Sequence, residues 1–326
     1  MSVETYHYVF GPLVNAALSG EKLRLNSSTT FWRVDGESLK RLWHRMQSDN
    51  MDVGNHWANA PTPSEAVFVV KEYPVVCEDG EADETGLYNS VSTPPASDVF
   101  RKERACLNLS FDRAIATPIA FCSDDFPVVR KMGQYWDTPD IREDWDPEAT
   151  DREQVVDERT VPVLRKLMTY QAEEFLEKRE WLNNALTRYD EASGLGRKPK
   201  DGFADYVEAL EALFTEGHEG ISDKLATRVA MALADEEEYS QFFEWLKKAY
   251  TVSSKKRHGR SVDPPEWEKL PTLRKVVRQS ILVALGLSRE IHSGDWTDKL
   301  LPRFGKRDKD LIEQLGRIRK EWNVVW

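Results

Sequence analysis

The feature that most constrains how this chain can fold is a run of three helical patterns between residues 206 and 250. In each pattern, apolar side chains recur at intervals of three or four residues, a spacing that places them on one face of an α-helix. Helices with one apolar face are stable when those faces pack together, so the run predicts a helical bundle. The three faces consist of Tyr206, Val207, Leu210, Leu213 and Phe214; of Ile221, Leu225, Val229 and Leu233; and of Tyr239, Phe242, Phe243, Leu246 and Tyr250.

Helical patterns on both sides extend this bundle. Before it, one long apolar stripe runs over residues 161–189. After it, Asp263-Pro264-Pro265 interrupts the chain, because proline lacks the amide donor that a helix needs. Helical patterns then resume over residues 273–285 and 311–322. We therefore expect an all-α domain of about six helices over residues 160–326.

The first 135 residues show a different pattern. Short apolar or alternating runs are separated by Gly, Pro, Asp and Ser, which is typical of β-strands joined by turns. One amphipathic helix, around residues 39–46, interrupts them. The chain is therefore predicted to be α+β, with a β-rich N-terminal recognition or sensor domain over residues 1–135. The predicted strands cover residues 5–10, 29–34, 66–70, 105–111 and 119–122.

An acidic segment separates the two predicted domains. Residues 136–158 contain ten Asp and Glu but only two Arg, and we interpret residues 136–159 as a linker. Alternating carboxylates in this segment suggest a calcium loop, but its turn glycine and final glutamate are replaced by Ala149 and Val155. The three cysteines of the chain lack the spacing of zinc ligands. The sequence thus indicates no metal site and no cofactor.

Basic residues gather at the end of the third helical pattern. Residues 245–326 carry 19 Lys and Arg against 10 Asp and Glu, although the whole chain has a formal net charge of −11. Residues 245–262 contain no acidic residue, an asymmetry that is typical of a surface facing a polyanion. A second interpretation is a solvated helix end, where cations are stabilised by the helix dipole. This basic cluster consists of Lys247, Lys248, Lys255, Lys256, Arg257 and Arg260.

The order of short motifs over residues 206–259 resembles a known family. The sequence EALF is followed by a Gly-containing turn, the helix SDKLATRVAMALA, and a tyrosine in the next helix before a Lys-rich end with His258-Gly259. In this order the motifs resemble the Apea-like branch of the HEPN family, over about residues 160–292. The resemblance implies an all-helical domain that cleaves or binds RNA in prokaryotic immunity and toxin systems. It also matches Glu211 and Arg228 to recurrent polar positions, which we interpret as an ion pair between helices.

The resemblance also implies a catalytic motif. HEPN RNases carry the motif R-x4-6-H, and here His258 takes the position of the His while Ser253 takes that of the Arg. Metal-independent RNA cleavage needs a base for the 2′-hydroxyl proton and a cation for the charge that develops on phosphorus. His258 would be the general acid and base, with Lys255 or Arg257 as a displaced cation. Alternatively, His258 is a surface residue that ends the helix beside Gly259.

Three hypotheses for the function follow from these residues. The helical domain is a metal-independent endoribonuclease, an RNA-binding domain without catalysis, or a module for dimerisation or docking of a partner protein. The family forms its cleft at a two-fold interface, which implies a homodimer that binds RNA through the basic cluster. The N-terminus lacks a signal sequence, and no apolar run could span a membrane. We therefore expect a cytoplasmic protein of antiviral defence or a toxin–antitoxin system, with no membrane partner.

Overall fold

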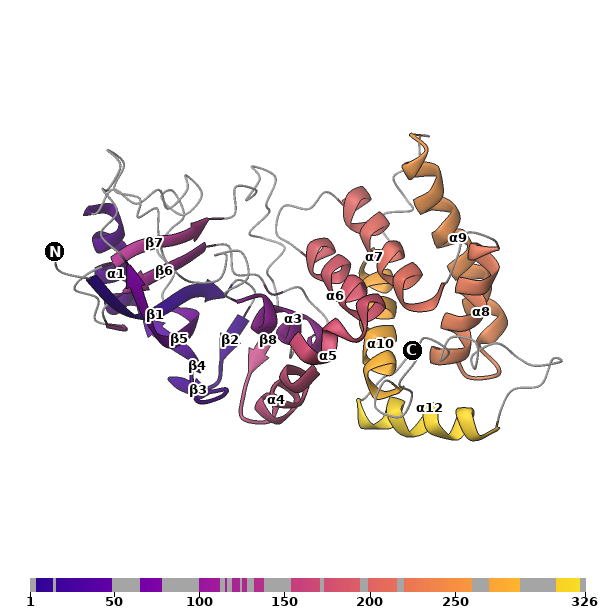
Figure 1. The fold of residues 1–326 in the computed structure, drawn as a ribbon, viewed down its shortest axis with the longest axis horizontal. Helices are drawn as coiled ribbons and strands as arrows, with labels where there is room; N and C mark the ends of the chain where they lie inside the picture. The colour runs from indigo at the N-terminus through magenta and orange to yellow at the C-terminus, as the bar shows by residue number, and fades with distance from the viewer. Residues whose placement is uncertain are drawn as a thin grey trace. The chain divides into compact units, whose positions relative to one another are not determined.

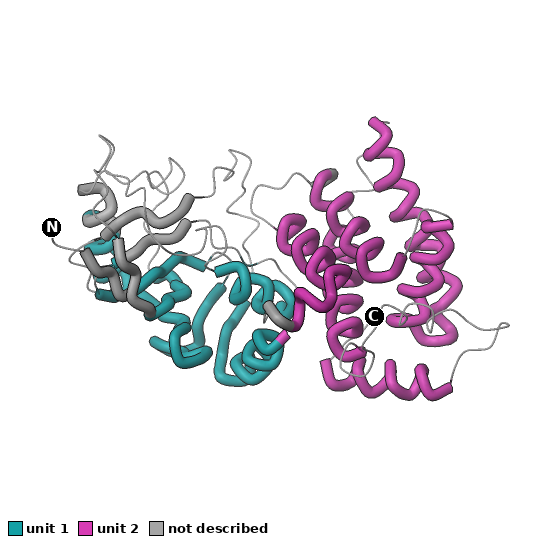
Figure 2. Tube along the Cα trace, in the orientation of Figure 1, with its two compact units in different colours: residues 1–169 teal, residues 170–326 magenta. Residues whose placement is uncertain are grey.

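The chain folds into two compact units, residues 1–169 (unit 1) and residues 170–326 (unit 2), which Figure 2 shows in different colours. In the computed structural model, unit 1 contains sheets and helices, and the described part of unit 2 is helical. The predicted α+β organisation is therefore confirmed. The structure describes residues 4–13, 16–48, 65–77, 100–111, 115, 119–123, 125–127, 132–137, 154–170, 173–193, 199–215, 220–259, 270–287 and 309–322.

Unit 1 is built on a six-stranded antiparallel sheet in the order β3-β4-β5-β1-β6-β7. The two central strands, β1 and β5, pair over most of their length, with Phe10 opposite Val70. Four of the five predicted strands coincide with strands of this sheet. The strands are β1 (Glu4–Leu13), β3 (Lys22–Arg24), β4 (Thr29–Asp35), β5 (Glu65–Cys77), β6 (Ile119–Ser123) and β7 (Met132–Asp137).

One face of the sheet packs against helix α1 (Gly36–Ser48). Because side chains alternate along a strand, every second residue of β1, β4 and β5 contributes to this apolar core. Asp35 accepts a hydrogen bond from the backbone N–H of Ser38 at 2.8 Å, which stabilises the start of α1. The core consists of Phe10, Val34, Leu39, Leu42, Phe68, Val70 and Phe126.

The remaining predicted strand, over residues 105–111, lies largely within helix α3 (Arg101–Ser110). Residues 105–109 are all buried, so the helix is enclosed on most sides and shows no polar face that would reveal its period. Asn108 is accommodated because its Oδ1 accepts a hydrogen bond from the backbone N–H of Ile115 at 2.7 Å. Cys106 is a free, buried thiol, and its burial raises its pKa well above the ordinary value.

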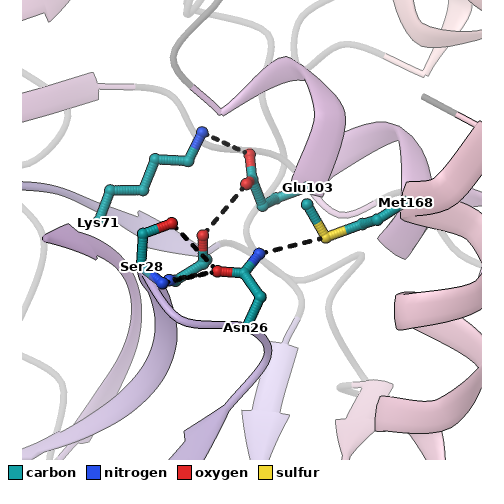
Figure 3. A network of polar contacts seen from close by, with 6 residues as sticks. Asn26, Ser28, Lys71, Glu103 and Met168 are labelled. Carbon is teal, nitrogen blue, oxygen red and sulfur yellow. Dashed lines mark hydrogen bonds and ion pairs between the residues drawn. The ribbon is translucent and has the colours of Figure 1, made fainter. Parts of the chain in front are cut away.

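An ion pair links α3 to the sheet (Figure 3). Lys71 Nζ lies 3.0 Å from Oε2 of the buried Glu103, and the hydroxyl of Thr29 lies 3.4 Å from Oε1 of the same carboxylate. Thr29 and Lys71 are opposite each other on β4 and β5, so a single carboxylate of α3 contacts both strands. A buried carboxylate is costly unless it is paired and hydrogen-bonded, and this arrangement provides both interactions.

The predicted acidic linker contains a strand, which corrects the domain boundary. Strand β8 (Gln154–Val156) pairs in parallel with β2 (Ala16–Leu18). The following helix, α4 (Thr160–Tyr170), also contacts the N-terminal part of the chain: Arg165 Nε donates a hydrogen bond to the carbonyl of Leu25 at 2.7 Å. Unit 1 therefore continues to residue 169, beyond the predicted boundary at 135.

Unit 2 is arranged around helix α7, which packs against α6, α8, α9 and α10 (Figure 1). The three predicted apolar faces lie on α7, α8 and α9, and most of their residues are buried. The single long stripe predicted over residues 161–189 is divided among α4, α5 and α6. None of the described helices is long and apolar enough to cross a membrane. The helices of unit 2 are α5 (Glu173–Glu177), α6 (Glu180–Ala192), α7 (Pro199–Phe214), α8 (Ile221–Leu233), α9 (Tyr239–Arg257), α10 (Leu270–Leu287) and α12 (Lys309–Glu321).

The C-terminal helix α12 approaches α10 closely at Gly286. A Cβ atom added to Gly286 would lie 2.6 Å from Cγ2 of the buried Ile318. Arg319, the next residue of α12, donates a hydrogen bond to the carbonyl of Leu233 at 3.0 Å, at the end of α8. Because the last carbonyls of a helix lack partners within it, this contact stabilises the end of α8.

We predict that Gly286→Ala lowers the free energy of unfolding by about 1 to 3 kcal/mol, because the added methyl group displaces Ile318. Gly316→Ala is the matched control: it lies within α12, and an added Cβ there would meet no atom within 4 Å. This second substitution should raise the free energy of unfolding by about 0.5 to 1 kcal/mol, since alanine favours the helix. Urea denaturation measures both, and a neutral Gly286→Ala would contradict the close approach.

Candidate functional site

Helix α9 ends at the residues that the sequence analysis singled out. His258 is the first residue after the helix, and Gly259 follows it with φ = +68°, the left-handed conformation that favours glycine. The backbone N–H groups of His258 and Gly259 donate hydrogen bonds to the carbonyls of Ser254 and Lys256, at 3.1 and 2.9 Å. The predicted helix end beside Gly259 is thus observed, and the structure leaves His258 exposed.

Ser253 lies on the opposite side of the helix from solvent. Its exposed fraction is 0%, and its hydroxyl has no hydrogen-bond partner among the described residues. Five residues along an α-helix correspond to a rotation of about 140°, so Ser253 and His258 project in different directions. The position where the family resemblance expects an arginine therefore faces the apolar interior of the bundle.

Three cations of the basic cluster form ion pairs with carboxylates of other helices. Arg257 is bound by both carboxylate oxygens of Glu211 on α7, with N–O distances of 2.6 and 3.0 Å. The sequence segment that supplies these cations contains no acidic residue, so their counter-charges come from distant parts of the chain. The other two pairs are Lys256 with Asp201 of α7, at 2.6 Å, and Lys247 with Asp223 of α8, at 2.8 Å.

Two of these ion pairs favour the charged form of their cation. The hydrogen bond from Arg257 to Glu211 raises the pKa of the guanidinium, and the hydrogen bond from Lys247 to Asp223 raises the pKa of the ammonium group. The ring of Tyr250 adds a cation–π contact, with its centroid 5.7 Å from Cζ of Arg257. All three pairs are partly exposed to water, so each stabilises the fold only weakly.

The prediction of an ion pair between Glu211 and Arg228 is wrong. Glu211 pairs with Arg257, whereas Arg228 is buried on α8 and its Nη1 donates a hydrogen bond to the carbonyl of Phe214. Phe214 is the last residue of α7, so Arg228 stabilises the end of that helix. The two polar positions are thus used in separate contacts, one at the surface and one in the core.

The remaining members of the basic cluster differ in their surroundings. Lys248 and Lys255 are exposed, and neither has an ion-pair partner in the described part of the chain. They lie seven residues apart, which places them on the same side of α9, together with the exposed Thr251 and His258. We call these four residues the exposed stripe. Arg260, the last member of the basic cluster, lies outside the described residues.

Chemically, the exposed stripe can attract and hydrogen-bond phosphate groups. It offers two ammonium groups and an imidazole along one side of the helix, whereas the hydroxyl of Thr251 donates a hydrogen bond to the carbonyl of Lys247 at 2.9 Å. Cleavage would in addition require a cation beside the imidazole. Of the two displaced cations that we considered, Arg257 is occupied by Glu211, whereas Lys255 is exposed on the same stripe as His258.

Comparison with known proteins adds no further assignment. No family model, no curated protein and no solved structure matches the chain. Within the described residues, no group of three or more His, Cys, Asp and Glu side chains could hold a metal ion.

We predict that Ser253→Ala leaves the free energy of unfolding unchanged or raises it by up to about 1 kcal/mol, because the lost hydroxyl has no partner among the described residues. Ser253→Arg restores the spacing of the family motif but places a charge in the core, so it should lower that free energy by about 3 to 5 kcal/mol. Thermal and urea denaturation measure both changes. A Ser253→Arg variant that is as stable as the parent and gains RNase activity would contradict the buried position of Ser253.

Proposed function

We propose that unit 2 is an HEPN-like helical domain that binds RNA through the exposed stripe of α9, without cleaving it. The observation that carries this proposal is the alignment of Lys248, Thr251, Lys255 and His258 on one exposed side of the helix. At a rise of 1.5 Å per residue, the stripe spans about 15 Å, a length that can contact more than one phosphate of an RNA strand. Cations in such a row neutralise phosphates and release condensed counterions, which is the main source of affinity for nucleic acids.

Two features favour binding over cleavage. Ser253 is buried where the family carries its arginine, and the neighbouring Arg257 is engaged by Glu211. A cation stabilises the charge that develops during cleavage best when it is already oriented toward the reacting phosphate. Arg257 is instead oriented toward Glu211. Metal-independent cleavage by His258 with Lys255 remains the enzymatic form of the same hypothesis, and the experiment below distinguishes the two.

A second candidate function is dimerisation or docking of a partner protein. It is favoured by aromatic residues on α9. Tyr239 stacks on Phe243 with ring centroids 6.2 Å apart, and Phe242 stacks on Trp245 with ring centroids 6.0 Å apart. Three of these four rings, all except that of Phe242, are only half-buried. Aromatic side chains of this kind are enriched at protein interfaces. Both functions could lie on α9, because the aromatic residues are at 239–245 and the exposed stripe is at 248–258.

The biological setting that we propose rests on the family resemblance. HEPN domains in prokaryotic defence and toxin–antitoxin systems act on RNA in the cytoplasm, and the basic helix end of unit 2 fits such a role. Unit 1 would then recognise the trigger or the partner protein of the system. The antiparallel sheet, packed against α1 and linked to α3 through Glu103, provides a folded body for that task.

The proposal predicts that Lys248→Ala and Lys255→Ala together weaken the binding of a fluorescein-labelled oligouridylate. The slope of log K against log salt should fall by about 1.4, because each lost contact to single-stranded RNA removes about 0.7. Fluorescence anisotropy over a series of NaCl concentrations measures this change. The control is Lys309→Ala with Lys320→Ala, two exposed lysines of α12 that alter the net charge equally.

Incubation of total RNA with the parent and with His258→Ala, both in EDTA, decides between binding and cleavage. We expect intact RNA with both proteins. Cleavage by the parent that is lost in His258→Ala would establish the endoribonuclease instead. If the parent binds no RNA at low salt, the docking module takes the place of the RNA-binding domain.

A further inference from the structure

The three ion pairs of the basic cluster are surface contacts that a stronger ligand can replace. The side chains of Lys247 and Asp223 are 39% and 68% exposed, and even Glu211, the most covered of the carboxylates, is 19% exposed. Ion pairs in such positions contribute about 0 to 1 kcal/mol. An RNA phosphodiester carries the same single negative charge as a carboxylate, but the phosphates of one strand are linked, so several of them can compete together for these weakly paired cations.

The guanidinium and ammonium groups in these pairs are the groups that bind phosphate in other proteins. Arg257 contacts both oxygens of Glu211 with its two terminal nitrogens, the arrangement that a guanidinium also uses for phosphate. Lys256 and Lys247 each place a single ammonium group on one carboxylate oxygen. The carboxylates thus occupy the donor groups that an RNA backbone would otherwise contact.

The geometry of α7 determines where two of these cations lie. Asp201 and Glu211 are ten residues apart on that helix, which corresponds to about 15 Å along its axis. Lys256 and Arg257 are neighbours in α9, yet they contact these two distant points. Their side chains therefore point to different parts of α7, and each is held by its own carboxylate.

From these contacts we propose that Asp201, Glu211 and Asp223 act as internal competitors of RNA for Lys256, Arg257 and Lys247. The inference rests on the proposed function and specifies which cations of the site are available. In the resting protein, RNA finds the exposed stripe free, whereas the three paired cations are released only by a ligand that displaces the carboxylates. The affinity and its salt dependence are therefore set by α7 and α8 as well as by α9.

The test is a triple variant, Asp201→Asn, Glu211→Gln and Asp223→Asn, which keeps the side-chain shapes and removes the negative charges. Three released cations should raise the salt slope for a labelled oligouridylate by about 2, and should tighten binding about tenfold to hundredfold at roughly 0.1 M NaCl. Fluorescence anisotropy gives both quantities, and circular dichroism verifies that the helical fold is kept.

The matched control is Glu177→Gln, Glu180→Gln and Glu313→Gln. These three exposed carboxylates lie on α5, α6 and α12, and their removal changes the net charge by the same amount. Competition predicts that the control changes the salt slope little. Equal effects of the two triple variants, or no tightening in the first, would overturn the competition while leaving RNA binding intact. Absence of RNA binding by every variant would overturn the proposed function itself.

A double-mutant cycle tests one pair separately and does not depend on the stability of the triple variant. Glu211→Gln should tighten binding in the parent but have no effect in an Arg257→Gln background, because the cation for which Glu211 competes is then missing. An equal gain in both backgrounds would show that Glu211 acts through its general charge, and would overturn its role as a competitor.

Discussion

Unit 2 depends on the burial of helix α7. Because α6, α8, α9 and α10 all pack on this helix, most of its side chains are apolar and enclosed. Three of its carboxylates are partly exposed, and each meets a cation of a neighbouring helix: Glu208 lies 3.4 Å from Nε of Arg188, Asp201 pairs with Lys256, and Glu211 binds Arg257. The central position of α7 therefore determines both the core of the bundle and the charges that surround the end of α9.

The sequence predicted the helices whose apolar residues recur at a clear interval. The prediction failed for a helix that is buried on most sides, α3, and for a strand whose pairing partner is distant in the sequence, β8. The apolar residues of α7, α8 and α9 recur at intervals of three or four, with polar or small residues between them, so their spacing indicated helices. Helix α3 was predicted as a strand because it is enclosed on most sides and the letters L-N-L-S-F over residues 107–111 happen to alternate. Strand β8 was missed because it has three residues and pairs with residues 16–18, far away in the sequence.

The candidate site was predicted in the same partial manner. The helix end at His258 and Gly259 follows from local chemistry, since a glycine after a basic helical turn commonly ends a helix. The counter-charges could not be predicted, because Glu211 and Arg257 are 46 positions apart and only the packing of α7 on α9 brings them together. The burial of Ser253 did have a signal: it continues the stripe of Phe242, Leu246 and Ala249 at intervals of three or four residues.

The parallel pairing of β2 with β8 has a consequence for the order in which the protein folds. Residues 16–18 leave the ribosome early, but their partners at 154–156 are made much later. Contacts of such wide sequence separation slow folding, since a long loop must close before the contact forms. During synthesis, the edge formed by β2 therefore stays uncovered until nearly all of unit 1 has been translated. The two-stranded sheet of β2 and β8 is separate from the six-stranded antiparallel sheet, and it can be completed only after residues 154–156 have been made.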